Sequence, residues 1–482
     1  MTTRARRSIA LPLLGLLGCG SSSSSHPESL DAAPIDAAAV DAAPVDAAGT
    51  EPSVVDATIP DATPPGATSP DATFDSTSDG SLAFTVSLGS GRAVATFLER
   101  EALGFRFGFV DGVMGAVSTG DAGYVFFGSG RTEFPEAGTC TGDGSTPNTQ
   151  GAYRFGVSTD AITENFGCRA LIANGEFVAE GGTQGAFDRD YVGGGPVLVV
   201  TSGGQRALVM TYHAEFHWGP TCNGAPCFYG TLGMAASVDD GATFTKVGEI
   251  VQPAISRADW ISTHVGTSLS IGAGPFALGD ATGRPVDPAT ADPASTYVYV
   301  FFDDYDTTNT APCSNQQCVG VARALLQDVA DAAFGVATAK PATQLFFKYH
   351  TGGEASTFTE PGASGSVDDS VAGGSYTAIL SGAFELSALY DRTLQEVILA
   401  YRTPNSNDIF FRTSGDLLAW PDSEVLDASI HEDGGDRYPS LVGELPNADI
   451  GGASPWVFYT NGLTSWPTST FMSRRVNVAA GP

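Results

Sequence analysis

The stretch Leu208–Val251 reads LVMTYHAEFHWGPTCNGAPCFYGTLGMAASVDDGATFTKVGEIV, and the fold prediction starts from a short segment inside it. Residues Ser237–Phe244, SVDDGATF, follow the pattern S-x-D-x-G-x-T-aromatic. Asp239 can accept hydrogen bonds from turn amides, Gly241 supplies a permissive backbone, and Phe244 can pack beneath the turn. The segment before the turn is small and apolar, and the one after it alternates. Together they predict a β-hairpin.

A strongly apolar, aromatic segment recurs along residues 81–482, where alternation, abundant glycine and scarce helix signals predict an all-β domain. The recurring segments are residues 124–127, 208–212, 297–302, 397–401 and 456–459. Each follows a glycine-rich or small-residue segment that could line a central channel, and each precedes a third apolar segment. Some of these third segments lead into a turn and a fourth element, as at Ser237 and again at Thr413–Trp420.

This repetition predicts a five-bladed β-propeller built of four-stranded antiparallel blades, in which radial repetition hides the strand edges. Early strands within Phe84–Phe97 or Phe105–Val110 are expected to complete the last blade. A β-sandwich is the structural alternative, but it gives no reason for five matched sets of strands.

The order of these motifs resembles the five-bladed β-propeller glycosidases and their bacterial relatives with Asp-box turns, within the wider sialidase-like group. The segments that carry the resemblance are Tyr212–Glu215, Gly233–Phe244, Phe347–Tyr349 with Glu360–Gly362, Thr413–Trp420, and Tyr438–Val442. It covers nearly all of residues 81–480. The resemblance implies a central cavity that carries the chemistry, with the Asp-box turn lying away from it.

A glycosidase needs two carboxylates, one acting as acid and the other as base or nucleophile. Asp111 resembles the general-base aspartate that such enzymes place on their first blade, although it could equally be a turn residue before Gly112. Asp188 and Asp190 flank Arg189 ahead of the second channel-lining segment. Asp190 is the catalytic candidate and Asp188 a substrate-binding one; the alternative is that both are loop charges paired with Arg189.

Residues Tyr212–His217, YHAEFH, form the most unusual polar cluster of the chain. Strand alternation places His213 and Glu215 on one side, close to aromatic residues. Apolar surroundings would raise the pKa of Glu215, as a general acid requires, and His213 could orient it or bind a sugar hydroxyl. The alternatives are a buried polar brace and, less favoured, a His-x-Glu-x-His metal site. We predict no metal and no cofactor, and leave a structural Ca²⁺ open.

The third channel-lining segment departs from the glycosidase pattern. It is expected to open at His264, a substrate-binding candidate, but it contains no acid, and Asp303 and Asp304 come only after the following strand. This departure weakens the enzyme interpretation. Three further substrate-binding candidates belong to the fourth and fifth segments: Glu385, Arg437 and Tyr438.

The N-terminus predicts export and a lipid anchor. Residues 1–18 combine arginines with a short apolar run, and Leu16–Cys19 resembles a lipoprotein lipobox. Cleavage before Cys19 would leave a diacylated cysteine, which anchors stably. The alternative is an ordinary cleaved signal in which Cys19 is incidental. Gly20, where inner-membrane lipoproteins commonly carry Asp, favours the outer membrane, on its periplasmic or cell-surface side.

Residues 19–80 predict a disordered tether of Ala, Asp and Pro that contains no Lys or Arg and has almost nothing to bury. The whole chain has a net charge of −31 at pH 7, which excludes binding of nucleic acid through its phosphates. The partners that we expect are a carbohydrate and, through the lipid anchor only, a membrane; the protein is expected to be a monomer.

Six cysteines besides Cys19 predict disulfides in an exported domain. Cys222–Cys227 and Cys313–Cys318 share a C-x4-C spacing in loops, which leaves Cys140–Cys168 as the third pair, although six cysteines allow about fifteen pairings. The sequence thus predicts a surface-anchored, glycoside hydrolase-like protein. The alternative is a non-catalytic propeller that binds a glycan or a protein.

Overall fold

A computed structural model describes residues 84–96, 112–120, 123–133, 148–157, 162–165, 186–222, 225–264, 266–306, 317–352, 355–364, 371–404, 406–420, 425–431, 435–462 and 469–480. The chain divides into two units, Met1–Thr77 and Ser78–Pro482, and all described residues lie in the second. The predicted signal peptide, Cys19 and the whole predicted tether lie outside the described residues. So do Asp111, Cys140, Cys168 and Cys313.

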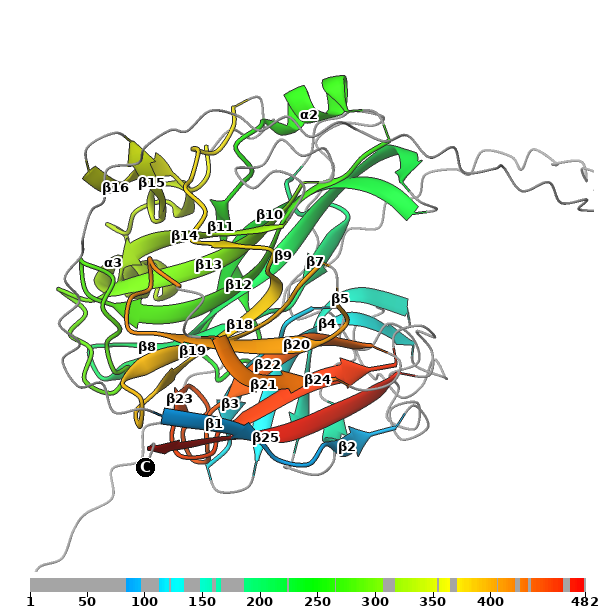
Figure 1. Ribbon diagram of the computed structural model, residues 1–482. Coiled ribbons are helices and arrows are strands. Elements are labelled where there is room, and N and C mark those ends of the chain that lie inside the picture. Colours follow the sequence, from blue (N-terminus) through cyan, green and yellow to red (C-terminus); the bar gives the residue numbers. More distant parts are fainter. Residues whose placement is uncertain are drawn as a thin grey trace, which may run out of the picture. The chain divides into compact units, whose positions relative to one another are not determined.

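The described chain is mostly β-strand, which confirms the all-β prediction (Figure 1). Two short α-helices, α2 (Arg257–Thr263) and α3 (Leu326–Ala333), and a 3₁₀ turn (Ala342–Gln344) interrupt it. None of the described helices is long and apolar enough to cross a membrane.

The strands form five consecutive antiparallel groups. The first group contains β3 (Gly115–Ser118), β4 (Tyr124–Glu133), β5 (Asn148–Val157) and β6 (Ile162–Asn165). The second contains β7 (Tyr191–Gly193), β8 (Val197–Ser202), β9 (Gln205–Cys222), β10 (Ala225–Ser237) and β11 (Thr245–Val251). The third contains β12 (Leu269–Gly279), β13 (Tyr297–Asp306), β14 (Cys318–Leu325), β15 (Phe347–Gly352), β16 (Ala355–Pro361) and β17 (Leu380–Ser381).

The fourth group contains β18 (Phe384–Asp391), β19 (Glu396–Arg402), β20 (Ile409–Ser414), β21 (Val425–Ile430) and β23 (Ile450–Gly451), the last of which pairs in parallel with β18. The fifth contains β22 (Asp436–Val442), β24 (Trp456–Asn461), β25 (Thr470–Ala480), β1 (Phe84–Leu88) and β2 (Arg92–Ala95). A short parallel pairing of β10 with β12 links the second and third groups, so hydrogen bonding gives four continuous sheets.

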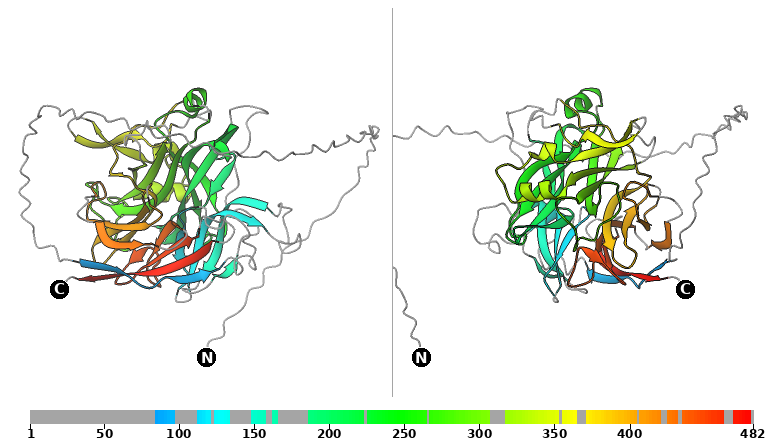
Figure 2. Two further views of the ribbon diagram at one scale, coloured as in Figure 1. Left: turned by 45° about the vertical axis from the view of Figure 1, so that its right-hand side comes forward. Right: turned by 90° about the vertical axis from the view of Figure 1, so that its left-hand side faces the viewer.

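The fifth group joins the two ends of the described chain. β1 and β2 both pair antiparallel with β25. The blue β1 and the red β25 lie side by side in Figures 1 and 2. An early strand therefore completes the C-terminal sheet, as the sequence predicts.

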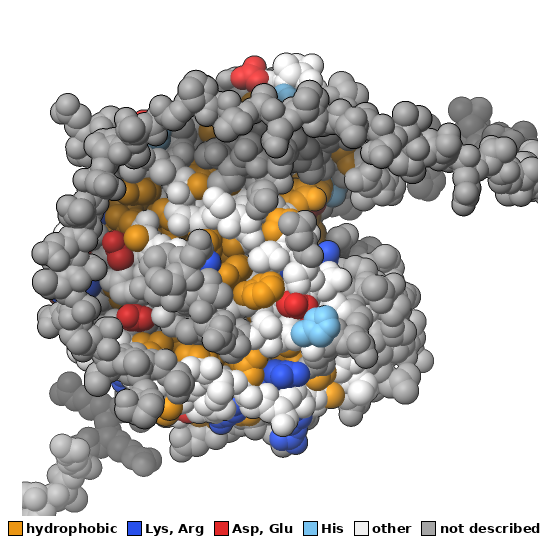
Figure 3. Space-filling view, viewed as in Figure 1, with side chains coloured by type: hydrophobic (Ala, Val, Ile, Leu, Met, Phe, Trp, Pro, Cys, Tyr) orange, Lys and Arg blue, Asp and Glu red, His pale blue; other side chains and the backbone are white. Residues whose placement is uncertain are grey.

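Five buried hydrophobic clusters each combine side chains from two strand groups. Four of them join groups that follow one another in sequence, and the fifth joins the last group to the first. In that fifth cluster, the ring of Phe126 on β4 stacks on Phe155 at 5.6 Å and meets Phe458 on β24 edge-on at 4.8 Å. Such aromatic contacts add to the stability gained by burying apolar area. On the face drawn in Figure 3, charged side chains are few and scattered.

The first strands of the third, fourth and fifth groups share a bulge. Between two paired positions, β12, β18 and β22 each have one more residue than the strand they pair with. Gly274, Glu385 and Tyr438 lie in these bulges, with φ angles of +88°, +51° and +54°. A bulge bends its strand and redirects the side chains next to it, and such bulges are common beside active sites.

The turn at Ser237–Phe244 forms as the sequence predicts. The Asp239 carboxylate accepts hydrogen bonds from the Thr243 amide at 2.9 Å and the Thr243 hydroxyl at 2.6 Å, and the Ser237 hydroxyl accepts one from the Gly241 amide at 2.8 Å. The Phe244 ring is buried beneath the turn, edge-on to Phe127 of the first group at 5.5 Å. The turn therefore fixes the second group against the first.

The related turn in the fourth group makes an equivalent contact. The Ser414 hydroxyl accepts a hydrogen bond from the Asp416 amide at 3.0 Å, and the Asp416 carboxylate accepts one from the Leu418 amide at 2.9 Å. Trp420 then packs edge-on against Phe301 of the third group at 5.8 Å. Both turns place an aromatic ring on the preceding strand group.

One predicted disulfide is confirmed. Cys222 and Cys227 are joined across the β9–β10 hairpin, with Cα atoms 4.9 Å apart. Cys318 is also disulfide-bonded and fully buried, but its predicted partner Cys313 lies outside the described residues.

We predict that Gly241→Ala destabilises the protein more than Gly203→Ala. Both glycines have a left-handed backbone, with φ of +80° and +57°, so alanine at either position costs about 1–2 kcal/mol of unfolding free energy. A Cβ at Gly241 would also lie 2.5 Å from the Phe127 ring, whereas one at Gly203 meets nothing within 4 Å. The added overpacking costs about 1–3 kcal/mol. Urea unfolding of the two variants measures the difference, and equal losses would contradict the close packing of the turn.

Candidate functional site

Side chains from all five strand groups surround one cavity of about 630 Å³. Its size suits a small-molecule ligand. The lining residues are Gly112, Val113, Ser129, Tyr191, Gly194, His213, Glu215, Phe228, Ser270, Gly272, Asp303, Tyr305, Gln317, Phe384, Glu385, Arg402, Pro404, Asn407, Arg437 and Tyr438. Five of the predicted site residues meet here: His213, Glu215, Glu385, Arg437 and Tyr438.

Glu215 is clamped between two histidines of its own strand. Its Oε1 lies 3.1 Å from His213 Nε2 and its Oε2 lies 2.5 Å from His217 Nε2. Burial alone would raise the pKa of Glu215, but the hydrogen bonds and charges of the two histidines outweigh burial and lower it to about 2. The predicted raised pKa of Glu215 is therefore wrong. The prediction gave more weight to the aromatic neighbours than to the hydrogen bonds from His213 and His217 on the same side of the strand.

Both ring nitrogens of His213 lie within hydrogen-bonding distance of an oxygen acceptor. Its Nδ1 lies 3.2 Å from the Ile271 carbonyl oxygen on β12, opposite the bond to Glu215. Burial lowers the pKa of His213, but Glu215, the carboxylate of Asp303 and the Ile271 carbonyl together raise it above its ordinary value. These contacts favour the imidazolium form, which carries a positive charge into the cavity wall.

Asp303 is the acid that the sequence interpretation missed. It lies on β13, the second strand of its group, and is only 7% exposed. Its Oδ2 accepts a hydrogen bond from the Glu385 main-chain N–H at 2.7 Å. Burial and the nearby Glu385 carboxylate raise the pKa of Asp303 to about 6, although the Glu385 N–H and the charge of His213 act in the opposite direction.

The neighbouring strand explains how Asp303 reaches the cavity. Gly272 on β12 is paired with Asp303, and a Cβ added at Gly272 would lie 2.4 Å from Asp303 Oδ1. An acid from the second strand therefore fills space that the first strand leaves open. The only sequence signal for this position of Asp303 was the Gly-Ala-Gly run at residues 272–274. That run is informative only once the register between β12 and β13 is known.

Glu385 links the fourth and fifth groups. Its Oε1 accepts a hydrogen bond from Arg402 Nη1 at 3.1 Å and lies 3.7 Å from Arg437 Nε. Its Oε2 accepts a hydrogen bond from the Tyr438 main-chain N–H at 3.2 Å. Arg402, which the sequence interpretation did not single out, forms its ion pair with Glu385 through a side chain that is only 4% exposed.

Asp188 and Asp190 lie outside the cavity lining. Asp188 is buried, accepts a hydrogen bond from the Tyr212 hydroxyl at 3.0 Å, and pairs with Lys246 at 2.5 Å. Asp190 pairs with Arg189 and accepts a hydrogen bond from the His217 main-chain N–H at 2.6 Å. The contacts of Asp190 match the alternative of a loop charge paired with Arg189. Through His217, it supports the clamp on Glu215.

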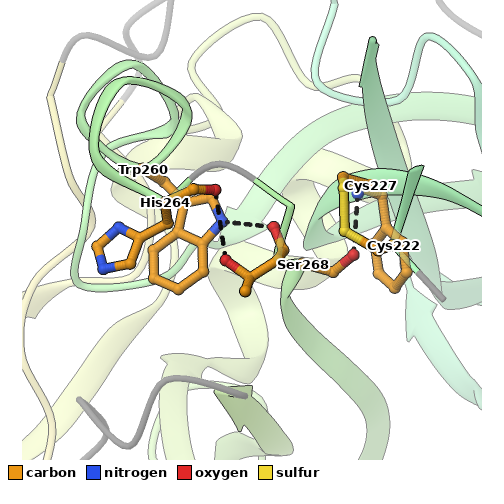
Figure 4. Close-up of a disulfide and its surroundings, with 7 residues drawn as sticks. Cys222, Cys227, Trp260, His264 and Ser268 are labelled. Atoms are coloured by element: carbon orange, nitrogen blue, oxygen red, sulfur yellow. Dashed lines mark hydrogen bonds between the residues drawn. A yellow bond between two sulfur atoms is a disulfide. The ribbon is translucent and has the colours of Figure 1, made fainter. Parts of the chain in front are cut away.

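His264 does not open the third channel-lining strand, which begins at Leu269. It caps the C-terminus of α2 and stacks on Trp260 with ring centroids 4.0 Å apart (Figure 4). The short helix α2, which starts at Ser256 with a side-chain cap, was not expected from the sequence. His264 is therefore not part of the cavity lining.

Asp111 lies outside the described residues, although Gly112, which follows it, lines the cavity. Among the described residues, no group of three or more His, Cys, Asp or Glu side chains could hold a metal ion. His213, Glu215 and His217 bind one another instead.

No protein-family model matches this chain, and no curated protein matches it. Among solved structures, a family 117 glycoside hydrolase from Zobellia galactanivorans is 11% identical, with 83% of this chain and 92% of that chain covered and a TM-score of 0.43. A glycosyl hydrolase from Bacteroides ovatus is 10% identical over 80% of this chain and 94% of that chain, with a TM-score of 0.39. A protein of unknown function from Dyadobacter fermentans is 12% identical, covers 76% of each chain and has a TM-score of 0.35.

We predict that Asp303→Asn becomes more stable relative to the parent protein as pH rises. The pKa of Asp303 is about 6 in the folded protein, against about 3.9 in an unfolded chain. Its contribution to stability is therefore fully present below pH 4 and is lost as pH rises through 6. From pH 4 to pH 7, the difference in unfolding free energy should move by up to about 3 kcal/mol in favour of the variant. Urea unfolding at both pH values tests this, with Asp240→Asn, an exposed acid, as the control that should show no such trend.

Glu215→Gln should show the opposite pH dependence. The folded pKa of Glu215 is about 2, below the unfolded value, so this carboxylate stabilises the protein above about pH 4.5 and the stabilisation is lost as pH falls toward 2. The variant should be less stable than the parent by up to about 3 kcal/mol at pH 7, and by less at pH 3. Unfolding at these pH values measures the gap, and Glu396→Gln on β19 is a control outside the cavity. A difference in unfolding free energy that does not change with pH would show that Glu215 stabilises the protein by packing alone.

Proposed function

We propose that the protein is a carbohydrate-active, glycoside hydrolase-like enzyme whose cavity holds the scissile bond. The observation that carries the proposal is that three carboxylates from three strand groups, Glu215, Asp303 and Glu385, line one cavity with different partners. Glu215 is bound by two histidines, Glu385 by arginine, and Asp303 by a main-chain N–H, with no cation in direct contact among the described residues. Carboxyl groups whose surroundings separate their pKa values are the usual basis for assigning acid and base roles.

Asp303 suits the role of proton donor. With a pKa raised to about 6, it carries its proton in mildly acidic water and can give that proton to the glycosidic oxygen as the bond to the leaving sugar breaks. The ionised Glu215 would stabilise the positive charge that develops on the sugar ring. Water would then attack the anomeric carbon. The residue that takes the proton of that water remains the predicted Asp111.

We also propose that the five strand groups are the blades of a five-bladed β-propeller with the cavity at its centre. Three observations support this arrangement. The hydrophobic clusters follow one another around all five groups, every group contributes to the cavity, and the N-terminal strands complete the last group. In a β-sandwich, one core would lie between two sheets. The turns at Ser237 and Ser414 fit the Asp-box interpretation.

For the cellular location, we propose a monomeric lipoprotein of the outer membrane, anchored through Cys19. The apolar run and the lipobox-like Leu16–Cys19 motivate this proposal, and residues 19–80 would hold the domain away from the membrane. Labelling with a radioactive fatty acid, compared between the parent protein and Cys19→Ala, would test the anchor.

A non-catalytic glycan-binding module is the second candidate, and one observation favours it. Both oxygens of Glu215 and both oxygens of Glu385 already accept hydrogen bonds or ion pairs from the protein. Groups held in this way are suited to fixing sugar hydroxyls in place. In this case Asp303 would bind a ligand without transferring a proton.

The deciding experiment compares hydrolysis and binding in Asp303→Asn. We expect hydrolysis of oligosaccharides by the parent protein to fall as pH rises above 6, because Asp303 must be protonated. The variant should lose about 10²–10⁴-fold in kcat while its affinity for sugar changes little. Release of reducing ends measures hydrolysis, and calorimetry measures binding.

Asp240→Asn serves as the control, since its exposed carboxylate lies in the turn at Ser237 and outside the cavity. If the parent protein binds sugars but hydrolyses none, the binding-module candidate holds. If Asp303→Asn hydrolyses as fast as the parent protein, Asp303 is not the proton donor.

A further inference from the structure

Tyr305 is the exception among the aromatic residues that line the cavity. It is 45% exposed, whereas Tyr191 is only 4% exposed. In the part of the chain that the structure describes, the other large exposed hydrophobic residues are all valines, none of which lines the cavity. Within that same part, the side chain of Tyr305 makes no hydrogen bond and no ring contact. An exposed ring without such contacts is a candidate ligand contact.

The strand fixes where this ring lies relative to Asp303. Both residues belong to β13, two positions apart, so their side chains leave the same face of the strand about 6.6 Å from each other along its axis. The paired positions on β12 are Gly272 and Ser270, which are both small. Because Asp303 is 7% exposed and Tyr305 is 45% exposed, Asp303 lies deeper in the cavity.

We propose that Tyr305 is a stacking platform for a sugar ring on the outer, leaving-group side of the bond that Asp303 would protonate. The apolar face of a hexose ring would lie on the phenol ring. A second sugar would lie deeper, among His213, Glu215 and the Glu385–Arg402 pair. The spacing of about 6.6 Å along the strand separates the stacked ring from the proton donor by roughly one sugar unit. The substrate class is therefore an oligosaccharide of at least two hexose units rather than a single sugar on a small aglycone.

This inference rests on the proposed carbohydrate site, but its test does not need turnover. We would measure binding by calorimetry in the Asp303→Asn background, using glucose, galactose, and the di- and trisaccharides of the cellulose, maltose, laminarin and β-galactan series. Tyr305→Ala should weaken di- and trisaccharide binding about tenfold, the usual scale of one aromatic contact, and leave monosaccharide binding within twofold.

Tyr305→Phe is the matched control. It keeps the ring and removes only a hydroxyl that has no partner among the described residues, so it should bind as the Asp303→Asn background does. Val371→Ala, another exposed position, controls for surface truncation. The proposal would be overturned if Tyr305→Ala bound the di- and trisaccharides as tightly as the Asp303→Asn background does. It would also be overturned if none of the sugars bound. Because hydrolysis is not measured, a failure of Asp303 as proton donor would leave these binding results unchanged.

Discussion

Phe126 lies between the first and last strand groups, with its ring stacked on Phe155 and edge-on to Phe458. Equivalent buried contacts recur between each pair of consecutive groups, so every group buries its second strand against a neighbour on either side. The cavity is lined by residues of both first and second strands, such as Glu385 on β18 and Asp303 on β13. Polar residues can therefore concentrate there without interrupting an apolar core, which is why one cavity receives side chains from all five groups.

The three carboxylates of the cavity differ in how far the surrounding groups compensate their negative charge. Glu215 and Glu385 are each bound by cationic or polar partners, and removing one partner of such a pair leaves a buried charge at a cost of several kcal/mol. Asp303 receives one main-chain N–H and lies near the negative Glu385, so its ionised form is disfavoured. Asp303 is thus a carboxyl group of the cavity whose burial costs stability at neutral pH. A carboxyl group that is costly to ionise in the folded state is the kind of group that can serve as an acid.

Residues whose positions follow from strand alternation were predictable from the sequence. His213 and Glu215 share a face because they are two apart on one strand, and Glu385 and Tyr438 were found because each lies near the start of a small-residue strand. Asp303 was missed because its place depends on the register between β12 and β13, which no local pattern reveals. His264 was misplaced for a related reason: it caps the C-terminus of the short helix α2, whereas the strand that it was expected to open begins at Leu269.

The bulges show how one repeated scaffold builds an asymmetric site. On β18 and β22, the left-handed bulge position holds Glu385 and Tyr438, although such a backbone costs a non-glycine residue about 1–2 kcal/mol. In return, the Tyr438 N–H donates to Glu385 and the Glu385 N–H donates to Asp303. On β12 the bulge position is Gly274, and Gly272, which is paired with Asp303, has no side chain to compete with Asp303 for the cavity. Backbone strain in two groups and a missing side chain in the third therefore bring polar atoms to one place.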